Sequence, residues 1–380
     1  MIIQQLSNEI DIKRYLKNLG VDGGGVHILA SKAKVHLVEI KALHVGAANI
    51  LKQDALSVGA DLAVPRGTVI AKEPKVNCLL IASTKALEVL AKKELAQPFG
   101  LKELAGKLKE ITKIKKPQKT KIMGVINAND DSFFAGSRFQ SSDAIKSIEK
   151  MIGEGADIID IGAVSSRPNA PQVSKVEELF RLKPILDLIQ EQKLYEKATF
   201  SIDSYEPEAI AYALESGFGI VNDITGLQND AICRLAAEYK AEVVIMHMQG
   251  NPRTMQQNPS YSDVLNDIYS FFQERIEKAK SFGIDDIVLD VGIGFGKSLE
   301  HNLLLLKHLE HFLTLQKPLL VGASRKSMID KIFPSEVEKR LAGTLALHLE
   351  AARRGASILR VHDVYEHVQA LKVQEALLKV

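Results

Sequence analysis

The sequence predicts an α/β protein, a (β/α)8 barrel preceded by a small N-terminal α/β domain. Eight short β-branched runs alternate with helical patterns over about 260 residues, after a basic stretch that contains a proline. Strands that are each followed by a helix form parallel sheets, and eight such units close into a barrel. A polar residue follows almost every run, and the carboxyl ends of barrel strands are where such folds carry their sites.

The composition narrows the function classes. Of the 380 residues, 46% are hydrophobic and 25% charged, as is usual for a globular protein. The formal net charge of +2 gives no overall field to attract nucleic acid or an anionic membrane. Cys78 and Cys233 have no CxxC spacing, so neither a disulfide framework nor a zinc site is indicated. The N-terminal residues lack the apolar core of a signal peptide, and no apolar run spans a membrane, so we expect a cytoplasmic protein.

Residues 113–120 form the expected linker, because four lysines surround Pro117 there and have no apolar face to bury. The N-terminal domain then covers residues 1–112 and the barrel covers residues 121–380. In the N-terminal domain we expect a turn at 23–25, strands at 26–30 and 76–81, and helices at 47–58 and 84–93. No group of residues in it demands chemistry, and we expect a structural or interaction role rather than a second activity.

Each barrel element follows from its own segment. The strand runs cover residues 122–126, 158–161, 200–202, 220–221, 243–246, 287–289, 319–321 and 358–361. The helical patterns cover residues 143–153, 176–192, 206–215, 230–239, 265–282, 303–312 and 340–353. Glycine follows several of these helices, as helix C-termini prefer.

The polar residues at the strand ends predict one shared site. They are Asn127, Asp160, Asp203, Asn222, Asp223, His247, Asp290, Ser324, Arg325, Lys326, Arg360, His362 and Asp363. Each alone could cap a helix or a turn, but side chains from all the strands converge on one axis. Asp203, Asn222 and Asp290 could accept hydrogen bonds from a flat heterocycle that bears amino and NH groups, to which Lys326 could donate.

A second, cationic group comprises Arg167, Arg360 and His362. Guanidinium groups bind phosphate oxygens bidentately, so we expect an anion near these residues. Asn127 could hold a hydrated Mg²⁺ that carries a diphosphate, because this ion keeps its waters and takes few protein ligands. Residues 292–298 match neither the phosphate-loop nor the dinucleotide pattern. Ser324 is not in a G-x-S-x-G turn, which argues against a hydrolase.

Eight motifs occur in the order found in dihydropteroate synthases, and this resemblance covers residues 121–380. The motifs are GVINANDDSF, GADIIDIGAVSSRP, FSIDSY, GIVNDITG, IMHM, VLDVGIGFGK, GASRKS and RVHD. The resemblance implies an enzyme, a transferase that joins a dihydropterin methyl diphosphate to 4-aminobenzoate and releases diphosphate in folate biosynthesis. It also implies a sulfonamide target and Mg²⁺ as cofactor. We further expect a homodimer formed through barrel helices.

The resemblance assigns residues to three subsites. Pterin-pocket positions are Asp203, Asn222, Met246, Asp290, Phe295 and Lys326. Diphosphate positions are Asn127, which would also bind Mg²⁺, together with Arg360 and His362. The 4-aminobenzoate positions are Ser166, Arg167, Pro168, Phe295 and Ser324. Catalysis is expected to proceed through a pterin cation, with Asp203, Asp290, Lys326 and Arg360 as the catalytic residues.

The chain departs from the family pattern in its first loop, where Asn129 and Asp130 replace threonine and proline. We expect an effect on loop dynamics and sulfonamide response rather than on the chemistry. One alternative function is a methyltetrahydrofolate-type pterin methyltransferase, which would have an Asn in place of Arg325-Lys326 and needs no diphosphate site. A non-catalytic pterin-binding protein is the other alternative, although it would be expected to lose the anion-site residues.

Overall fold

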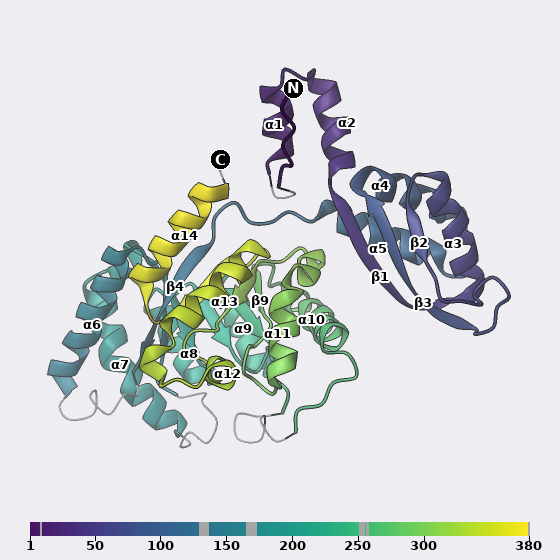
Figure 1. Ribbon diagram of the computed structural model, residues 1–380. Coiled ribbons are helices and arrows are strands. Elements are labelled where there is room, and N and C mark those ends of the chain that lie inside the picture. The colour runs from purple at the N-terminus through teal and green to yellow at the C-terminus, as the bar shows by residue number, and fades with distance from the viewer. Residues whose placement is uncertain (8–9, 129–136, 165–172, 251–254, 256–257, 379–380) are drawn as a thin grey trace. The chain divides into compact units, whose positions relative to one another are not determined.

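The chain divides into two compact units, described here from a computed structural model (Figure 1). Unit 1 comprises residues 1–114 and 375–380, and unit 2 comprises residues 115–374. The structure describes residues 1–7, 10–128, 137–164, 173–250, 255 and 258–378, with only the backbone described at 137–141. No helix in these ranges is long and apolar enough to span a membrane.

Unit 2 contains a closed barrel of eight parallel strands, which confirms the predicted fold class. Its strands are β4 (Lys121–Asn127), β5 (Ile158–Gly162), β6 (Thr199–Asp203), β7 (Ile220–Asp223), β8 (Glu242–Met246), β9 (Ile287–Asp290), β10 (Leu319–Val321) and β11 (Ile358–Val361). Neighbours in the barrel follow the order of the chain, and β11 closes it by pairing with β4 in parallel register, Arg360 opposite Met123.

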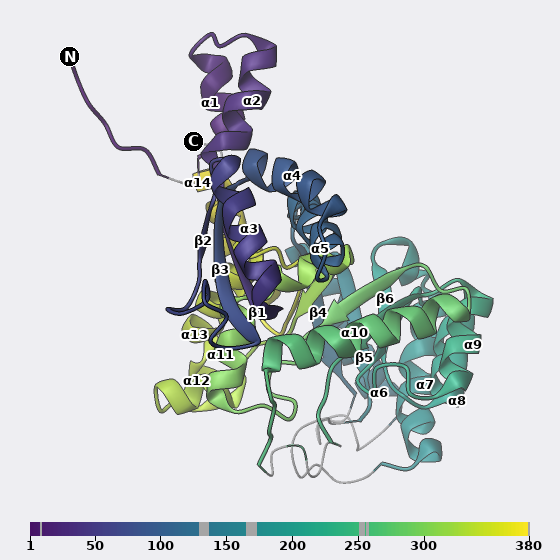
Figure 2. The same ribbon diagram turned by 90° about the vertical axis from the view of Figure 1, so that its right-hand side faces the viewer.

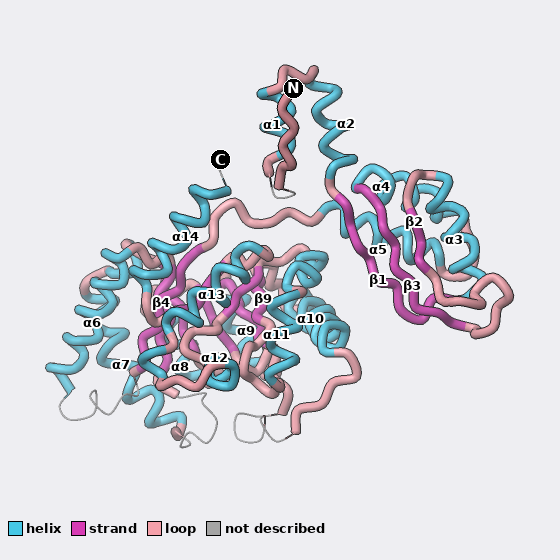
Figure 3. The backbone as a smooth tube through the Cα atoms, viewed as in Figure 1, coloured by secondary structure: helices cyan, strands magenta, loops and turns pink. Residues whose placement is uncertain are grey.

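Helices surround the barrel strands, as Figure 3 shows in cyan around magenta. They are α6 (Ser137–Glu154), α7 (Lys175–Glu191), α8 (Pro207–Glu215), α9 (Asp230–Tyr239), α10 (Val264–Ser281), α11 (Leu299–Lys307), α12 (Ser327–Ile332), α13 (Leu341–Arg353) and α14 (Val364–Leu378). Short 3-10 turns are η3 (Leu194–Glu196), η4 (Leu309–Leu315) and η5 (Val337–Lys339). Each predicted helical segment overlaps one of these helices or η4.

An apolar layer fills the inside of the barrel. It consists of Met123, Ile158, Ile220, Val244, Val288, Leu320 and Ile358, one residue from each strand except β6. The β6 residue next to this layer is Ser201, which pairs with Ile220 in register and is fully buried. Because side chains alternate along a strand, the residue two positions after each of these points inward as well, closer to the carboxyl end. The site is built from those residues.

Unit 1 contains a three-stranded antiparallel sheet in the order β1-β3-β2 (Figure 2). Its elements are α1 (Ile12–Asn18), α2 (Gly23–Ala33), β1 (Val35–His44), α3 (Val45–Ser57), β2 (Asp61–Ala63), β3 (Lys75–Ser83), α4 (Thr84–Lys93), η1 (Glu94–Ala96) and α5 (Leu101–Lys113). Buried and exposed residues alternate along β3, and the buried ones join a core with apolar side chains of α3, α4 and α5.

The predicted strand at 26–30 and turn at 23–25 were wrong, because both lie in helix α2. A short apolar run cannot by itself distinguish a strand from a helix. Val26 and Ala30 are the buried residues of this helix, four positions apart, which is the spacing of one helical face. The ten-residue strand that follows, β1, was not predicted.

The expected linker is tied to the barrel by its polar side chains. Residues 114–120 connect the end of α5 to the start of β4. Lys116 donates to the carbonyl of Arg353 at 2.9 Å, and Lys119 pairs with Asp157 at 2.8 Å. The lysines that suggested a solvated linker therefore also fasten it to unit 2.

Candidate active site

Five inward-facing residues lie next to the apolar layer, on the side toward the carboxyl ends of the strands. They are Asp160, Asn222, Met246, Asp290 and Arg360, each two positions after a member of that layer. On β6 the residue two positions after Ser201 is Asp203. The barrel thus brings together residues separated by up to 200 positions in the sequence.

Arg360 lies at the centre of this group. Its Nε donates to Asp160 Oδ2 at 2.6 Å, and its Nη2 donates to Asp203 Oδ2 at 2.7 Å. Asn222 Nδ2 donates to the same Asp160 oxygen at 3.2 Å. The other oxygen, Asp160 Oδ1, is buried and has no hydrogen-bond partner among the described residues. One guanidinium therefore holds two carboxylates that would otherwise repel each other in a low-dielectric interior.

The charged groups in this cluster shift one another's pKa values. Burial raises the pKa of the Asp203 carboxyl to about 7, although Arg360 opposes that rise and Asp160 adds to it. Burial also lowers the pKa of the Arg360 guanidinium, but the charges of Asp160 and Asp203 outweigh it, and the net shift is upward. Arg360 is therefore a permanent cation, and the Asp203 carboxyl keeps its proton to a higher pH than a free aspartate does.

Asp290 is fixed by a glycine-rich turn after β9. Its Oδ1 accepts from the Gly292 N–H at 2.8 Å, and burial raises the pKa of its carboxyl while this N–H and Lys326 lower it. Gly292 has φ +67°, and a Cβ there would lie 2.0 Å from the carbonyl oxygen of His247. Only glycine allows the two strand-end loops to approach this closely.

Lys297 holds the same turn through hydrogen bonds of its buried ammonium group. This fully buried lysine donates to the carbonyl oxygens of His247 and Phe295, at 3.1 and 2.9 Å, and lies 3.0 Å from His247 Nδ1. Burial lowers the pKa of Lys297 to about 7 and, together with the lysine's charge, the pKa of His247 to about 2. His247 is therefore neutral, and its Nδ1 accepts from the lysine.

An apolar wall lies beside the carboxylates. Phe295 and Met246 pack in one buried cluster with Ile224 and Met255. The Lys326 Nζ lies 4.2 Å from the centre of the Phe295 ring, which is a cation–π distance. A flat ring system can bind where such a wall meets hydrogen-bonding groups.

The ends of β10 and β11 contribute a polar pair. The Ser324 Oγ lies 2.9 Å from His362 Nδ1 and accepts from the His362 backbone N–H at 3.3 Å. Beside them, Arg325 Nη2 and Nε bind the two oxygens of the Asp363 carboxylate, at 2.5 and 3.1 Å. Ser324 is buried, whereas His362 is partly exposed.

The remaining predicted residues divide into two sets. Asn127 is the last residue of β4, and its side chain is partly exposed. Ser166, Arg167 and Pro168, and the departures at Asn129 and Asp130, lie outside the residues that the structure describes. The predicted division into a pterin group and a cationic group is not a spatial one, because Arg360 of the second group binds Asp203 of the first.

Two members of the site had no role in the sequence-based assignment. Asp160, predicted as a strand end without a ligand of its own, lies in the middle of β5 and is fully buried. An aspartate within an otherwise apolar strand could have marked it, since a buried carboxylate needs a partner. Lys297 belongs to the segment 292–298, which matches no phosphate loop, and its burial follows from tertiary packing that a motif does not encode.

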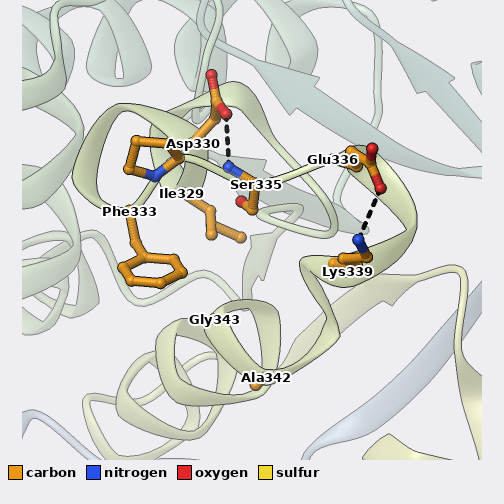
Figure 4. Close-up of a pocket in the computed structure, with 9 residues that line it drawn as sticks. Ile329, Asp330, Phe333, Ser335, Glu336, Lys339, Ala342 and Gly343 are labelled. Carbon is orange, nitrogen blue, oxygen red and sulfur yellow. Dashed lines mark hydrogen bonds and ion pairs between the residues drawn. The ribbon is translucent and has the colours of Figure 1, made fainter.

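An open pocket of about 750 Å³ lies away from these residues, between α12 and α13 (Figure 4). Its lining includes Ile329, Phe333 and Ala342, with Asp330 accepting from the Ser335 backbone N–H and Lys339 paired with Glu336. None of the strand-end residues lines it. We therefore place the chemistry at the strand ends and not in this pocket.

Comparisons with known proteins agree with that location. A family model described as "Pterin binding enzyme" matches residues 123–362. A Helicobacter pylori protein, the bifunctional dihydropteroate synthase/dihydropteroate reductase, is 45% identical over 377 residues, 99% of each chain. The structure of Yersinia pestis dihydropteroate synthase with a sulfonamide drug is 38% identical, with a TM-score of 0.65 over 69% of this chain and 95% of that one. The chain belongs to the dihydropteroate synthase family.

Membership in this family confirms the predicted enzyme, a transferase of folate biosynthesis that makes dihydropteroate. The synthase prediction, rather than the methyltransferase or the non-catalytic alternative, is the one confirmed. A second structure of the family, from Xanthomonas albilineans, contains 4-aminobenzoic acid and is 37% identical, with a TM-score of 0.64 over 69% of this chain and 94% of that one. The Helicobacter pylori match includes both units of this chain.

Proposed function

We propose that the dihydropterin ring of the substrate lies over the inward-facing residues on the carboxyl side of the apolar layer. Asp290 and Asn222 accept hydrogen bonds from its amino and NH groups, and Lys326 donates to a ring acceptor. Phe295 and Met246 pack beside the ring. The observation that carries this proposal is the convergence of polar side chains from several strands on Asp160, whose Oδ1 is buried without a hydrogen-bond partner among the described residues. A buried polar atom without a partner is costly unless a ligand compensates.

We assign the diphosphate to Arg360 and His362. A guanidinium has five N–H donors, of which the two carboxylates take two, so donors remain for a phosphate oxygen. Ser324 orients the His362 ring through Nδ1, and Nε2 is the atom we assign to the diphosphate. Ser324 and Phe295, with Ser166, Arg167 and Pro168, are proposed to hold 4-aminobenzoate.

Asn127 fits the proposed Mg²⁺ as its protein ligand. The described residues contain no group of three or more His, Cys, Asp or Glu side chains that could hold a metal. A single amide oxygen suits an ion that keeps its waters and arrives with a diphosphate. Such an ion would neutralise charge on the leaving group.

The residues support an ionisation mechanism. The C–O bond between the pterin methylene and the diphosphate breaks, and the electron pair leaves with the diphosphate. The arylamine nitrogen of 4-aminobenzoate then forms the C–N bond, and its proton passes to solvent. Asp203 and Asp290 stabilise the positive charge on the pterin, while Arg360 and His362 stabilise the departing diphosphate. Preorganised charges of this kind lower the barrier without a covalent intermediate.

The test is an assay for diphosphate release from the pterin substrate, with Mg²⁺ and with or without 4-aminobenzoate. We expect release that depends on both, together with formation of 7,8-dihydropteroate. Absence of turnover with the intact chain would contradict the proposed function.

The pKa of Asp203 gives a pH dependence for this reaction. The ionised carboxylate is the form that stabilises the cation, so kcat/KM should rise with pH through a midpoint at about 7 and level off above it. The same shift lowers stability as pH rises from 3.8 to about 7, because over that range the folded state binds this proton more tightly than the unfolded state does. A pH profile of kcat/KM for wild type and Asp203→Asn tests it. A wild-type profile that is flat below neutral pH would rule out the assignment.

We propose dihydropteroate reduction as a second activity, which involves unit 1. The support is the 45% identity, over 99% of both chains, to a protein whose name includes dihydropteroate reductase. This reaction adds two electrons and two protons to 7,8-dihydropteroate, so an electron donor is required. Incubation of the intact chain with 7,8-dihydropteroate and a reduced nicotinamide, with and without a flavin, should yield tetrahydropteroate. Absence of tetrahydropteroate under both conditions would contradict this second activity.

A further inference from the structure

The ends of β10 and β11 must stay in register for the proposed site to work. The two strands pair in parallel, with Val321 opposite Leu359. Beyond that pair the chain leaves the sheet, and Ser324 and Lys326 follow one strand while His362 follows the other. The 2.9 Å contact between Ser324 Oγ and His362 Nδ1 depends on how these two loops are held.

Two buried histidines connect the loops from behind. The Ala323 backbone N–H donates to His348 Nε2 at 2.9 Å, and His348 Nδ1 lies 2.9 Å from His367 Nε2. His367 Nδ1 lies 2.5 Å from the Asp363 carbonyl oxygen. His348, from α13, is 0% exposed and His367, from α14, is 2% exposed. We call this chain from Ala323 to Asp363 the histidine relay.

The two ends of the relay determine where its protons are. A backbone N–H can only donate, so His348 Nε2 accepts and its Nδ1 carries the proton. His367 Nε2 therefore accepts from His348, and His367 Nδ1 donates to the Asp363 carbonyl, which can only accept. Every member is satisfied when both rings are neutral. Burial lowers the pKa of both histidines, which agrees with this state.

The relay is part of a larger ring of contacts around Arg325. The Asp363 residue that ends the relay also binds the Arg325 guanidinium through its carboxylate. Arg325 has φ +55°, a left-handed conformation that costs energy in a residue other than glycine. Its backbone N–H donates to Thr344 Oγ1 at 3.0 Å. The loop after β10 is thus held in a strained shape by contacts with α13 and with the end of β11.

We propose that His348 and His367 are positioning residues of the transferase. They set the distance between the loop that carries Ser324 and Lys326 and the strand end that carries His362, without touching substrate. This inference rests on the proposed function, in which these residues bind 4-aminobenzoate, the pterin and the diphosphate.

The central test compares His348→Leu with His348→Gln. Leucine removes both ring nitrogens, whereas glutamine keeps one acceptor and one donor. His348→Leu should lower kcat/KM for the pterin diphosphate on the order of 10- to 100-fold, since small misplacements of binding groups have effects of that size. It should also weaken binding of inorganic diphosphate and speed hydrogen exchange at the Ala323 amide. His348→Gln should restore most of each property.

A double-mutant cycle separates the relay from general loss of packing. His367→Leu should give the same defect, and the double variant should be little worse than either single variant, because one connection is broken in all three. His27→Gln, at an exposed histidine of unit 1, is the matched control. Thermal unfolding and circular dichroism check that each variant folds.

Wild-type kcat/KM and diphosphate affinity in a folded His348→Leu would overturn the inference. So would additive defects in the double variant, or a failure of glutamine to restore the Ala323 amide protection. Diphosphate binding and hydrogen exchange do not require turnover, so they test the relay even if the intact chain shows no synthase activity. A failure of the relay and a failure of the proposed function are therefore distinguishable.

Discussion

Arg360→Met should lower the free energy of unfolding by about 3–5 kcal/mol and abolish turnover. Removing one partner of a buried ion pair leaves the other charge uncompensated, and effects of that size follow. Here two carboxylates lose their cation together, with the Asp160 side chain 0% exposed and that of Asp203 14% exposed. Urea unfolding measures the stability, and diphosphate release measures the activity.

Arg354→Met is the matched control for this prediction. The Arg354 side chain is 23% exposed, as is that of Arg360, and it also pairs with two carboxylates. Its partners, Glu310 and Glu350, are 43% and 37% exposed, so its loss should cost at most about 1 kcal/mol. Arg360→Met with Asp160→Asn should recover part of the lost stability. Equal effects of the two arginine variants would contradict a buried charge cluster.

Asp203→Asn should reduce turnover on the order of 10²- to 10³-fold, the range seen when one preorganised electrostatic group is removed from an active site. Asparagine keeps the size and a hydrogen-bond acceptor for Arg360, but it loses the charge that stabilises the pterin cation. Steady-state kinetics of diphosphate release measure the effect.

The fold should be unchanged in this variant, because Arg360 keeps its bond to Asp160. Asp187→Asn, on helix α7, changes the same residue type at a position 48% exposed and should leave turnover unaffected. Near-normal activity of Asp203→Asn would contradict the role in stabilising the cation.

The barrel, and the polar residues at the carboxyl ends of its strands, could be predicted because both depend on local sequence patterns. Alternation of β-branched runs with helices marks the strands, and a strand end limits where a following polar side chain can point. Asp203, Asn222 and Asp290 were identified in this way, and they lie at the carboxyl ends of their strands.

The pairing of these residues could not be predicted in the same way. Arg360 contacts Asp160 across 200 positions of sequence, and no local pattern distinguishes that contact from a free cationic site. The histidine relay is invisible for the same reason, since His348 and His367 lie on different helices and each resembles an ordinary helical residue. In unit 1, the predicted strand at 26–30 was wrong because so short a run is not enough to distinguish a helix from a strand by its periodicity.

The apolar layer from Met123 to Ile358 also limits the routes by which substrates could enter the proposed site and products could leave it. Because side chains of this layer fill the barrel interior below the proposed site, we expect ligands to enter and leave at the strand ends. In the proposed arrangement, the substrate group that reaches deepest enters before any group that lies above it, and dihydropteroate leaves before the next pterin enters. The proposed site is therefore a cavity that is open at one end, which is filled and emptied once in each reaction cycle.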